Sequence, residues 1–223
     1  MTRNDELALL IDGARRLDAA MDAPQVEALL RLVDELERAN AEFNLTAIRD
    51  RPGMLVKHVL DSLSVQPYLR GERIADVGTG AGFPGLPLAI ANPKRRFTLI
   101  EATGKKARYV ERTARLLELG NVEVANLRAE LYRPAVPFDT VVARALSSLA
   151  DFAVHAGTLC APDGRLLAMK GKRPDQEIAA VPKSFRVSAV HRIALPGLDD
   201  ERHLVELSPA GPGSPARPKP NTT

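Results

Sequence analysis

Four glycines follow an acidic residue closely in the segment DVGTGAGFPG, which begins at Asp76 and ends at Gly85. An apolar run precedes the acid and another follows the last glycine, which predicts a strand, a turn and a helix in that order. Glycine lets the backbone turn sharply and lets a ligand approach it closely, so this arrangement is typical of a nucleotide site. A single glycine could serve chain reversal alone, whereas four glycines favour a ligand site.

Two kinds of ligand fit this turn in different registers. Gly80, Gly82 and Gly85 match the G-x-G-x-x-G fingerprint of dinucleotide sites, which would indicate an NAD-dependent oxidoreductase. Pro84 lies inside that match and removes a backbone donor where a pyrophosphate needs one. Read from Asp76, the segment instead resembles motif I of the class I methyltransferases, which bind S-adenosyl-L-methionine (SAM). SAM has no phosphate and carries two cationic groups, which an acid beside the turn suits.

Two later segments extend the predicted cofactor site. Glu101 ends the next apolar run, about twenty residues beyond the glycines, where nucleotide-binding folds hold a ribose. Its carboxylate can accept hydrogen bonds from both ribose hydroxyls. Ala129 and Glu130 follow the third predicted strand, where such folds hold the adenine. A solvent-facing acid is an equally good interpretation of Glu130.

The methyl acceptor is narrowed by motifs that the sequence lacks. Amino-group methyltransferases for adenine or guanine place an Asn- or Asp-Pro-Pro-aromatic motif after the fourth strand, where this chain reads VVARALSSL. A carbon-5 cytosine enzyme needs a thiol, and the single cysteine, Cys160, fits a small packed residue better. Guanine N7 carries an in-plane lone pair and no proton. It needs no general base, only alignment with the methyl group.

Clusters of basic residues indicate a polyanionic partner. Residues 1–70 carry 9 Lys and Arg against 12 Asp and Glu, whereas residues 71–150 carry 12 against 8. The clusters are Lys105, Arg108, Arg112 and Arg115 on one helix face, Lys94, Arg95 and Arg96 in a loop, and Lys170, Lys172 and Arg173 after the fifth strand. Phosphate contact is favoured for Lys170, which topology places near the site. A solvated face is the better interpretation of the helix stripe, because Glu111 can pair with Arg115.

The elements that position these residues alternate between strand and helix. This order predicts a class I methyltransferase fold, a Rossmann-like and mostly parallel seven-stranded sheet with an antiparallel edge. Strands are expected at 73–78, 96–102, 121–127, 138–146, 164–171, 185–193 and 202–208, and helices at 24–43, 54–66, 86–92, 104–120 and 150–160. We therefore divide the chain into an N-terminal helical cap (1–70), a SAM-binding domain (71–208) and a disordered tail (209–223).

The chain resembles the RsmG (GidB) family, which methylates guanine N7 in the 530 loop of 16S ribosomal RNA. The resemblance runs from about residue 44 to 207 and is carried by FNLTAI, KHVLDSL, DVGTGAGFPGLPLAI, LIEATGKKARYV, RAE, ARAL and MKG. It implies SAM contacts at Gly78, Phe83, Ala129, Glu130 and Arg144. Phe83 stands where the family commonly has Leu, and Glu101 where it often has Asp, so the apolar wall and the carboxylate are both kept.

The segment KHVLDSL crowds polar groups onto adjoining faces of one predicted helix. His58 and Asp61 are its candidates for chemistry. The resemblance implies that this helix covers the SAM site and helps to present the guanine, with His58 and Arg144 as positioning residues and no general base. A His58–Asp61 pair in a packing seam is the alternative, and a buried structural ion pair is the alternative for Arg144.

The whole sequence sets wider bounds on the function. No apolar stretch approaches the roughly 18 residues that span a membrane, and no secretory h-region opens the chain. We expect a cytoplasmic monomer that binds 16S rRNA or the small ribosomal subunit, without a metal. The alternatives are a methyltransferase for another RNA or a small molecule, and a catalytically inactive RNA-binding assembly factor.

Overall fold

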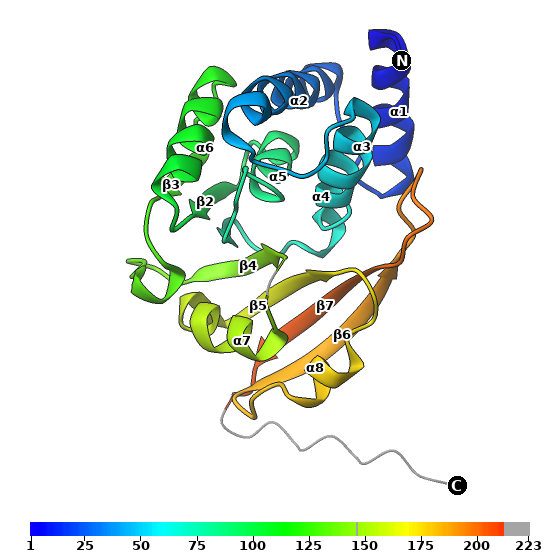
Figure 1. Ribbon diagram of the computed structural model, residues 1–223. Coiled ribbons are helices and arrows are strands. Elements are labelled where there is room, and N and C mark those ends of the chain that lie inside the picture. The colour runs from blue at the N-terminus through cyan, green and yellow to red at the C-terminus, as the bar shows by residue number, and fades with distance from the viewer. Residues whose placement is uncertain (146, 212–223) are drawn as a thin grey trace, which may run out of the picture.

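Seven strands form one sheet in the order β3-β2-β1-β4-β5-β7-β6 in the computed structural model, which describes residues 1–145 and 147–211 (Figure 1). The strands are β1 (Arg73–Val77), β2 (Arg96–Ile100), β3 (Val122–Ala125), β4 (Phe138–Arg144), β5 (Cys160–Lys170), β6 (Phe185–Ile193) and β7 (Arg202–Pro209). Strands β1 to β5 pair in parallel, and β7 runs antiparallel to both β5 and β6. The predicted fold is confirmed. The strand order reverses at β1, so a ligand crevice is expected beyond the carboxyl ends of β1 and β4.

Helices cover both faces of the sheet. They are α1 (Arg3–Arg16), α2 (Ala23–Phe43), α3 (Arg51–Met54), η1 (Leu55–Leu60), α4 (Asp61–Leu63), η2 (Gln66–Tyr68), α5 (Gly85–Ala91), α6 (Gly104–Leu116), η3 (Ala129–Leu131), α7 (Leu149–Ala156), η4 (Gly157–Leu159) and α8 (Asp175–Ala179). Alternate strand residues face opposite layers: Ile74 joins the core under α1, α2, α5 and α6, whereas Ala75 joins the core under α7. The cap residue Leu60 shares the first core with Leu86 of α5.

The first helices begin with side-chain caps. Thr2 and Asp22 each form a capping box, in which the cap side chain accepts from a backbone N–H three residues on and the N3 side chain returns a bond. The helix predicted over 54–66 is present as far as Leu63 but changes winding within its length. Its middle, η1, is a π-helix, a rare conformation that often marks functional sites.

Several elements differ from the sequence predictions; the helix predicted at 150–160 ends at Ala156, and β5 already begins at Cys160. The helix predicted at 104–120 ends at Leu116, and Glu118 just beyond it adopts the left-handed backbone conformation. The short helix α8 was not predicted, because five residues are too few to show helical periodicity. β7 continues through Pro209, the first residue of the predicted tail. The rest of that tail, from residue 212, lies outside the described residues.

Candidate functional site

The glycine turn joins β1 to α5 and divides its glycines between two roles. Gly78 and Gly80 have positive φ angles of 70° and 61°. A Cβ at Gly78 would meet nothing within 4 Å, and one at Gly80 would meet only the Gly78 carbonyl oxygen at 3.9 Å. A Cβ on Gly82 would lie 2.4 Å from Leu86. The first two glycines therefore leave open space for a ligand, whereas Gly82 allows the turn to pack closely.

Asp76 lies beneath this turn and shapes it. Its Oδ2 accepts hydrogen bonds from the Thr79 hydroxyl at 2.6 Å and from the Gly85 backbone N–H at 2.8 Å. Burial raises the pKa of Asp76 to about 6, although the hydrogen bonds from Thr79 and Gly85 oppose that shift. The side chain does not line the large cavity described below, and its contact with cationic SAM stays a prediction. Its Oδ1 has no hydrogen-bond partner within the described chain, so one acceptor remains for a cofactor or water.

The predicted ribose and adenine residues lie on the β2–β3 side of the turn. Glu101 accepts from the Gly80 N–H through Oε2 at 2.9 Å and from the Thr103 N–H through Oε1 at 2.7 Å. Its carboxylate therefore ties the end of β2 to the turn. Ala129 and Glu130 belong to η3, and Glu130 is exposed. None of these three predicted cofactor residues lines the large cavity on the other side of the turn.

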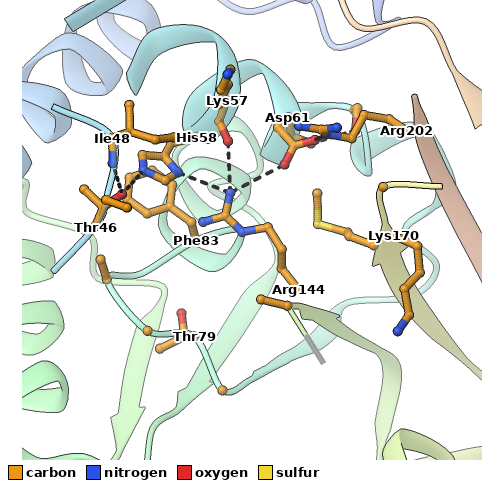
Figure 2. A pocket seen from close by; sticks show the side chains of 18 of the residues that line it. Thr46, Ile48, Lys57, His58, Asp61, Thr79, Phe83, Arg144, Lys170 and Arg202 are labelled. Carbon is orange, nitrogen blue, oxygen red and sulfur yellow. Dashed lines mark hydrogen bonds and ion pairs between the residues drawn. The ribbon is translucent and has the colours of Figure 1, made fainter. Parts of the chain in front are cut away.

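That cavity measures about 640 Å³ and opens between the glycine turn, η1 and the start of β7. Figure 2 shows Arg144 in its middle, between His58 and Asp61. Further walls come from Leu45–Ile48, Gly78–Ala81, Met169–Gly171 and Arg202–Leu204. Gly78, Gly80 and Phe83 of the glycine turn are thus brought to one site with the predicted residues of the KHVLDSL helix, His58 and Asp61.

His58 is held as a neutral ring against Phe83. The two rings stack with centroids 4.9 Å apart. Its Nε2 lies 2.8 Å from the Thr46 hydroxyl, and its Nδ1 lies 3.3 Å from Nη1 of Arg144. Because a guanidinium only donates, Nδ1 accepts and Nε2 carries the proton. Burial, followed by the charge of Arg144, lowers the His58 pKa to about 4, which makes the ring a poor proton acceptor.

Arg144 is fixed by several partners at once. Nη1 donates to the Lys57 carbonyl oxygen at 3.1 Å and lies 3.5 Å from Oδ2 of Asp61. The guanidinium carbon lies 5.6 Å from the centre of the Phe83 ring. The structural ion pair that we considered for Arg144 is present, but the side chain keeps 23% of its surface exposed and lines the cavity.

Asp61 lies between two guanidinium groups. Its second oxygen, Oδ1, is 3.3 Å from Nε of Arg202. Burial raises the Asp61 pKa, and the charges of Arg144 and Arg202 oppose that shift. The alternative His58–Asp61 pair is not formed, since both side chains contact Arg144 instead. Sequence reasoning missed Arg202 and Thr46, although Thr46 belongs to the quoted segment FNLTAI.

The predicted RNA-binding residues differ in their surroundings. The ammonium of Lys170 lies 2.8 Å from Glu177 on α8 and is mostly buried. Arg173 pairs with Asp175 at 2.8 Å, whereas Lys172 and Arg108 are exposed. On α6, the Lys105 ammonium lies 4.4 Å from the centre of the Phe43 ring. Arg115 pairs with Glu111 at 3.4 Å, as the solvated-face interpretation expects. RNA contact by these residues stays a prediction.

Comparison with known proteins places this site in a family. The family described as GidB, rRNA small subunit methyltransferase G, matches residues 25–205. The Ribosomal RNA small subunit methyltransferase G of Nitrosococcus oceani is 45% identical over 205 residues, which cover 92% of this chain and 96% of that protein. The protein of the same name from Xanthomonas campestris is 48% identical over 203 residues, covering 90% and 94%.

Solved structures support the same fold. The glycopeptide N-methyltransferase MtfA, complexed with S-adenosyl-L-homocysteine, aligns with a TM-score of 0.59 at 11% identity, covering 68% of this chain and 86% of that one. Among residues 1–145 and 147–211, no helix is both long and apolar enough to cross a bilayer. The glycine turn, the cavity beside it and the match along most of the chain agree. The chain belongs to the GidB family of rRNA small subunit methyltransferases, which are SAM-dependent enzymes.

Proposed function

We propose that the protein methylates N7 of one guanine in 16S ribosomal RNA, the family's G527 in the 530 loop. The observation that carries this proposal is the state of the acid–base groups beside Arg144. His58 has a low pKa and its lone pair already accepts from Arg144, and Asp61 is held between two cations. Cations already contact both groups, which disfavours removal of a substrate proton by either. Guanine N7 has none to remove, so the site suits this acceptor.

The cofactor fits the chain on the side of the turn that the glycines leave open. SAM supplies a methyl group on a positively charged sulfur, and the chain supplies the surfaces that hold it. Gly78 and Gly80 let a ligand approach the backbone, and we assign Glu101 to the ribose. Ala129 and Glu130 are assigned to the adenine. The NAD-dependent alternative is wrong, because the family depends on SAM.

Arg144 and His58 act by position in this proposal. The Lys57 carbonyl and the Asp61 carboxylate fix the guanidinium. The stacked rings of His58 and Phe83 form an apolar wall beside it. Such a wall excludes water and limits how a flat base can lie. Turnover then depends on alignment of the acceptor with the methyl group.

RNA reaches the site across the basic residues near the cavity mouth. We assign phosphate contacts to Lys172, Arg173, Lys105 and Arg108, which have exposed or half-exposed side chains. Lys170 already pairs with Glu177, so a phosphate there must compete with that carboxylate. We further propose that the protein acts in the cytoplasm, because its family acts on small-subunit rRNA, and that it acts as a monomer.

Two measurements test the proposal. N7-methylguanine at the family's position should be lost from 16S rRNA when the gene is deleted and restored when it returns. If N7-methylguanine persists in 16S rRNA after the deletion, the proposed function is wrong. If the purified protein shows no methyl transfer, the inactive RNA-binding assembly factor is favoured instead. With small subunits and saturating SAM, the single-turnover rate should stay nearly flat from about pH 6.5 to 9.

His203 is the control for that pH profile. It lines the cavity, and its Nδ1 lies 2.8 Å from the Gly171 carbonyl oxygen, to which it must donate. Its Nε2 therefore carries the lone pair. A rate that rises with pH in the parent protein and becomes flat in His203→Asn would indicate a general base, and with it an amine or hydroxyl acceptor.

A further inference from the structure

The loop between α5 and β2 gathers Lys94, Arg95 and Arg96 at the end of the sheet opposite the catalytic cavity. β2 begins at Arg96 and ends at Ile100, beside the glycine turn, so about 17 Å of strand separates the two ends. A second cavity, of about 540 Å³, opens at this loop. The three cations share its lining with the start of α2 and the α6–β3 turn.

The backbone of this loop is fixed by the protein itself. The Asn121 side-chain amide donates to the carbonyl oxygens of Ala89 at 3.1 Å, Asn92 at 3.2 Å and Arg95 at 3.1 Å. The Arg96 N–H donates to the Glu72 carbonyl oxygen at 2.8 Å. The cations therefore extend from a rigid base, which reduces the entropy lost when they hold a ligand.

The charges in the loop have no acidic partners. Across residues 1–145 and 147–211, none of the three cations forms an ion pair with a carboxylate, and Nη1 of Arg95 is buried without a hydrogen-bond partner. By contrast, Arg51 contacts three carboxylates: Glu6, Asp34 and Glu37. A buried, unpaired guanidinium N–H is costly. A ligand with several acceptor oxygens would satisfy it.

Two acids line the same cavity but do not neutralise the loop. Asp22 caps α2, where its Oδ1 accepts from the Gln25 N–H at 2.9 Å. Glu118 is exposed to water. The 21-residue helix α2 also points its positive N-terminal end at this cavity. The local charge thus favours an anion.

Helix α6 connects this loop to the catalytic end of the sheet. It begins just after β2 ends and runs back to the turn that lines the second cavity (Figure 1). Lys105, Arg108, Arg112 and Arg115 follow one face along that path, although a phosphate must compete there with Glu35 for Arg112 and with Glu111 for Arg115. We propose that Lys94, Arg95 and Arg96 form a second phosphate-binding site for the substrate RNA, whose backbone runs from the catalytic cavity along α6 to the opposite end of the sheet. This inference rests on the proposed function.

Charge reversal tests the second site in the full-length protein. Lys94→Glu with Arg96→Glu leaves the half-buried Arg95 in place. Lys183→Glu with Arg186→Glu is the matched control, because it makes the same change in net charge at exposed positions before and at the start of the edge strand β6, away from the catalytic cavity. Binding of purified small subunits should weaken about tenfold in the first variant at 0.1 M salt. The slope of log affinity against log salt should decrease by about 1 to 2.

The controls separate the inference from its alternatives. SAM affinity and melting temperature should match the parent protein in both double variants, and the control should keep the parent salt slope. If the slope of log affinity against log salt is the same in the two variants, net charge alone explains the weaker binding, and the proposal is overturned. A lower melting temperature in the first variant alone would assign the loop a structural role and would also overturn it. RNA binding is measured without turnover, so absence of N7 methylation would refute the proposed function and leave this test valid.

Discussion

The two walls of the proposed catalytic cavity are built in opposite ways. The glycine wall depends on hydrogen bonds between residues that are close in the sequence. Asp76 and Gly85 are 9 residues apart, and Gly80 and Glu101 are 21 residues apart. The charged wall joins distant segments, since Arg144 contacts Lys57 from 87 residues away and Asp61 from 83. Spacing along the sequence can therefore predict the first wall. Only the finished sheet, with β4 and β7 in place, can assemble the second.

The walls also use their acids differently. Asp76 is buried among neutral donors, so burial dominates and its pKa rises to about 6. Asp61 is buried between two guanidinium groups, which oppose the rise that burial causes. The first acid holds a turn in shape, whereas the second holds two cations at the edge of a cavity. Substitutions in the glycine wall should therefore mainly weaken SAM binding, whereas substitutions in the charged wall should mainly lower the free energy of unfolding.

The largest expected effect is at the glycine wall. Gly80→Val places a β-branched side chain at a φ of 61° and in the open space beside the turn. Both the strain and the lost space oppose binding, so the Kd for SAM should rise roughly 100-fold. Titration calorimetry measures it. Gly120→Val is the control, because its Cβ would also meet nothing within 4 Å and its φ is not positive. Unchanged SAM affinity in Gly80→Val would place the cofactor elsewhere.

The next effect is at the charged wall. Asp61→Ala leaves Arg144 and Arg202 close together without the carboxylate between them. Loss of one partner from a buried ion pair typically costs about 3 to 5 kcal/mol, and the partial exposure of both arginines favours the lower value. Urea unfolding measures the change. The Kd for SAM should change less than in Gly80→Val. A variant as stable as the parent would show that water screens both arginines without help from Asp61.

The same contrast explains how much the sequence could predict. Asp76, the glycines and Glu101 are found from spacing alone, because their contacts are local. No such pattern marks Arg202, because it comes close to Asp61 only when β7 takes its place beside β5 in the sheet. The π-helical winding of η1 leaves the apolar pattern of the segment intact and so stays hidden. Glu177 was missed with α8, and its pair with Lys170 changes how that lysine can meet a phosphate.

The smallest expected effect is a pair of opposed pH dependences. The His58 pKa is about 4 in the folded protein against 6.5 for the free side chain. Between these two pH values His58 binds more protons in the unfolded chain than in the folded one. The contribution of His58 to the free energy of unfolding therefore increases as pH rises and is lost as pH falls from 6.5 towards 4. The Asp76 pKa is about 6 against 3.8. Its contribution acts in the opposite direction: it is present below 3.8 and is lost as pH rises through 6.

In the parent protein the contributions of His58 and Asp76 partly cancel between about pH 4 and 6. Together they should therefore change its free energy of unfolding little in this range. His58→Gln removes the first contribution, and the free energy of unfolding should then decrease as pH rises through this window. Asp76→Asn removes the second, and the free energy of unfolding should increase with pH instead. Urea unfolding at several pH values measures both slopes. If the two variants keep the parent's slope, the two walls do not differ in protonation, because neither residue then changes its proton affinity on folding. Slopes of opposite sign would show that, in this pH window, Asp76 in the glycine wall takes up a proton on folding, whereas His58 in the charged wall releases one.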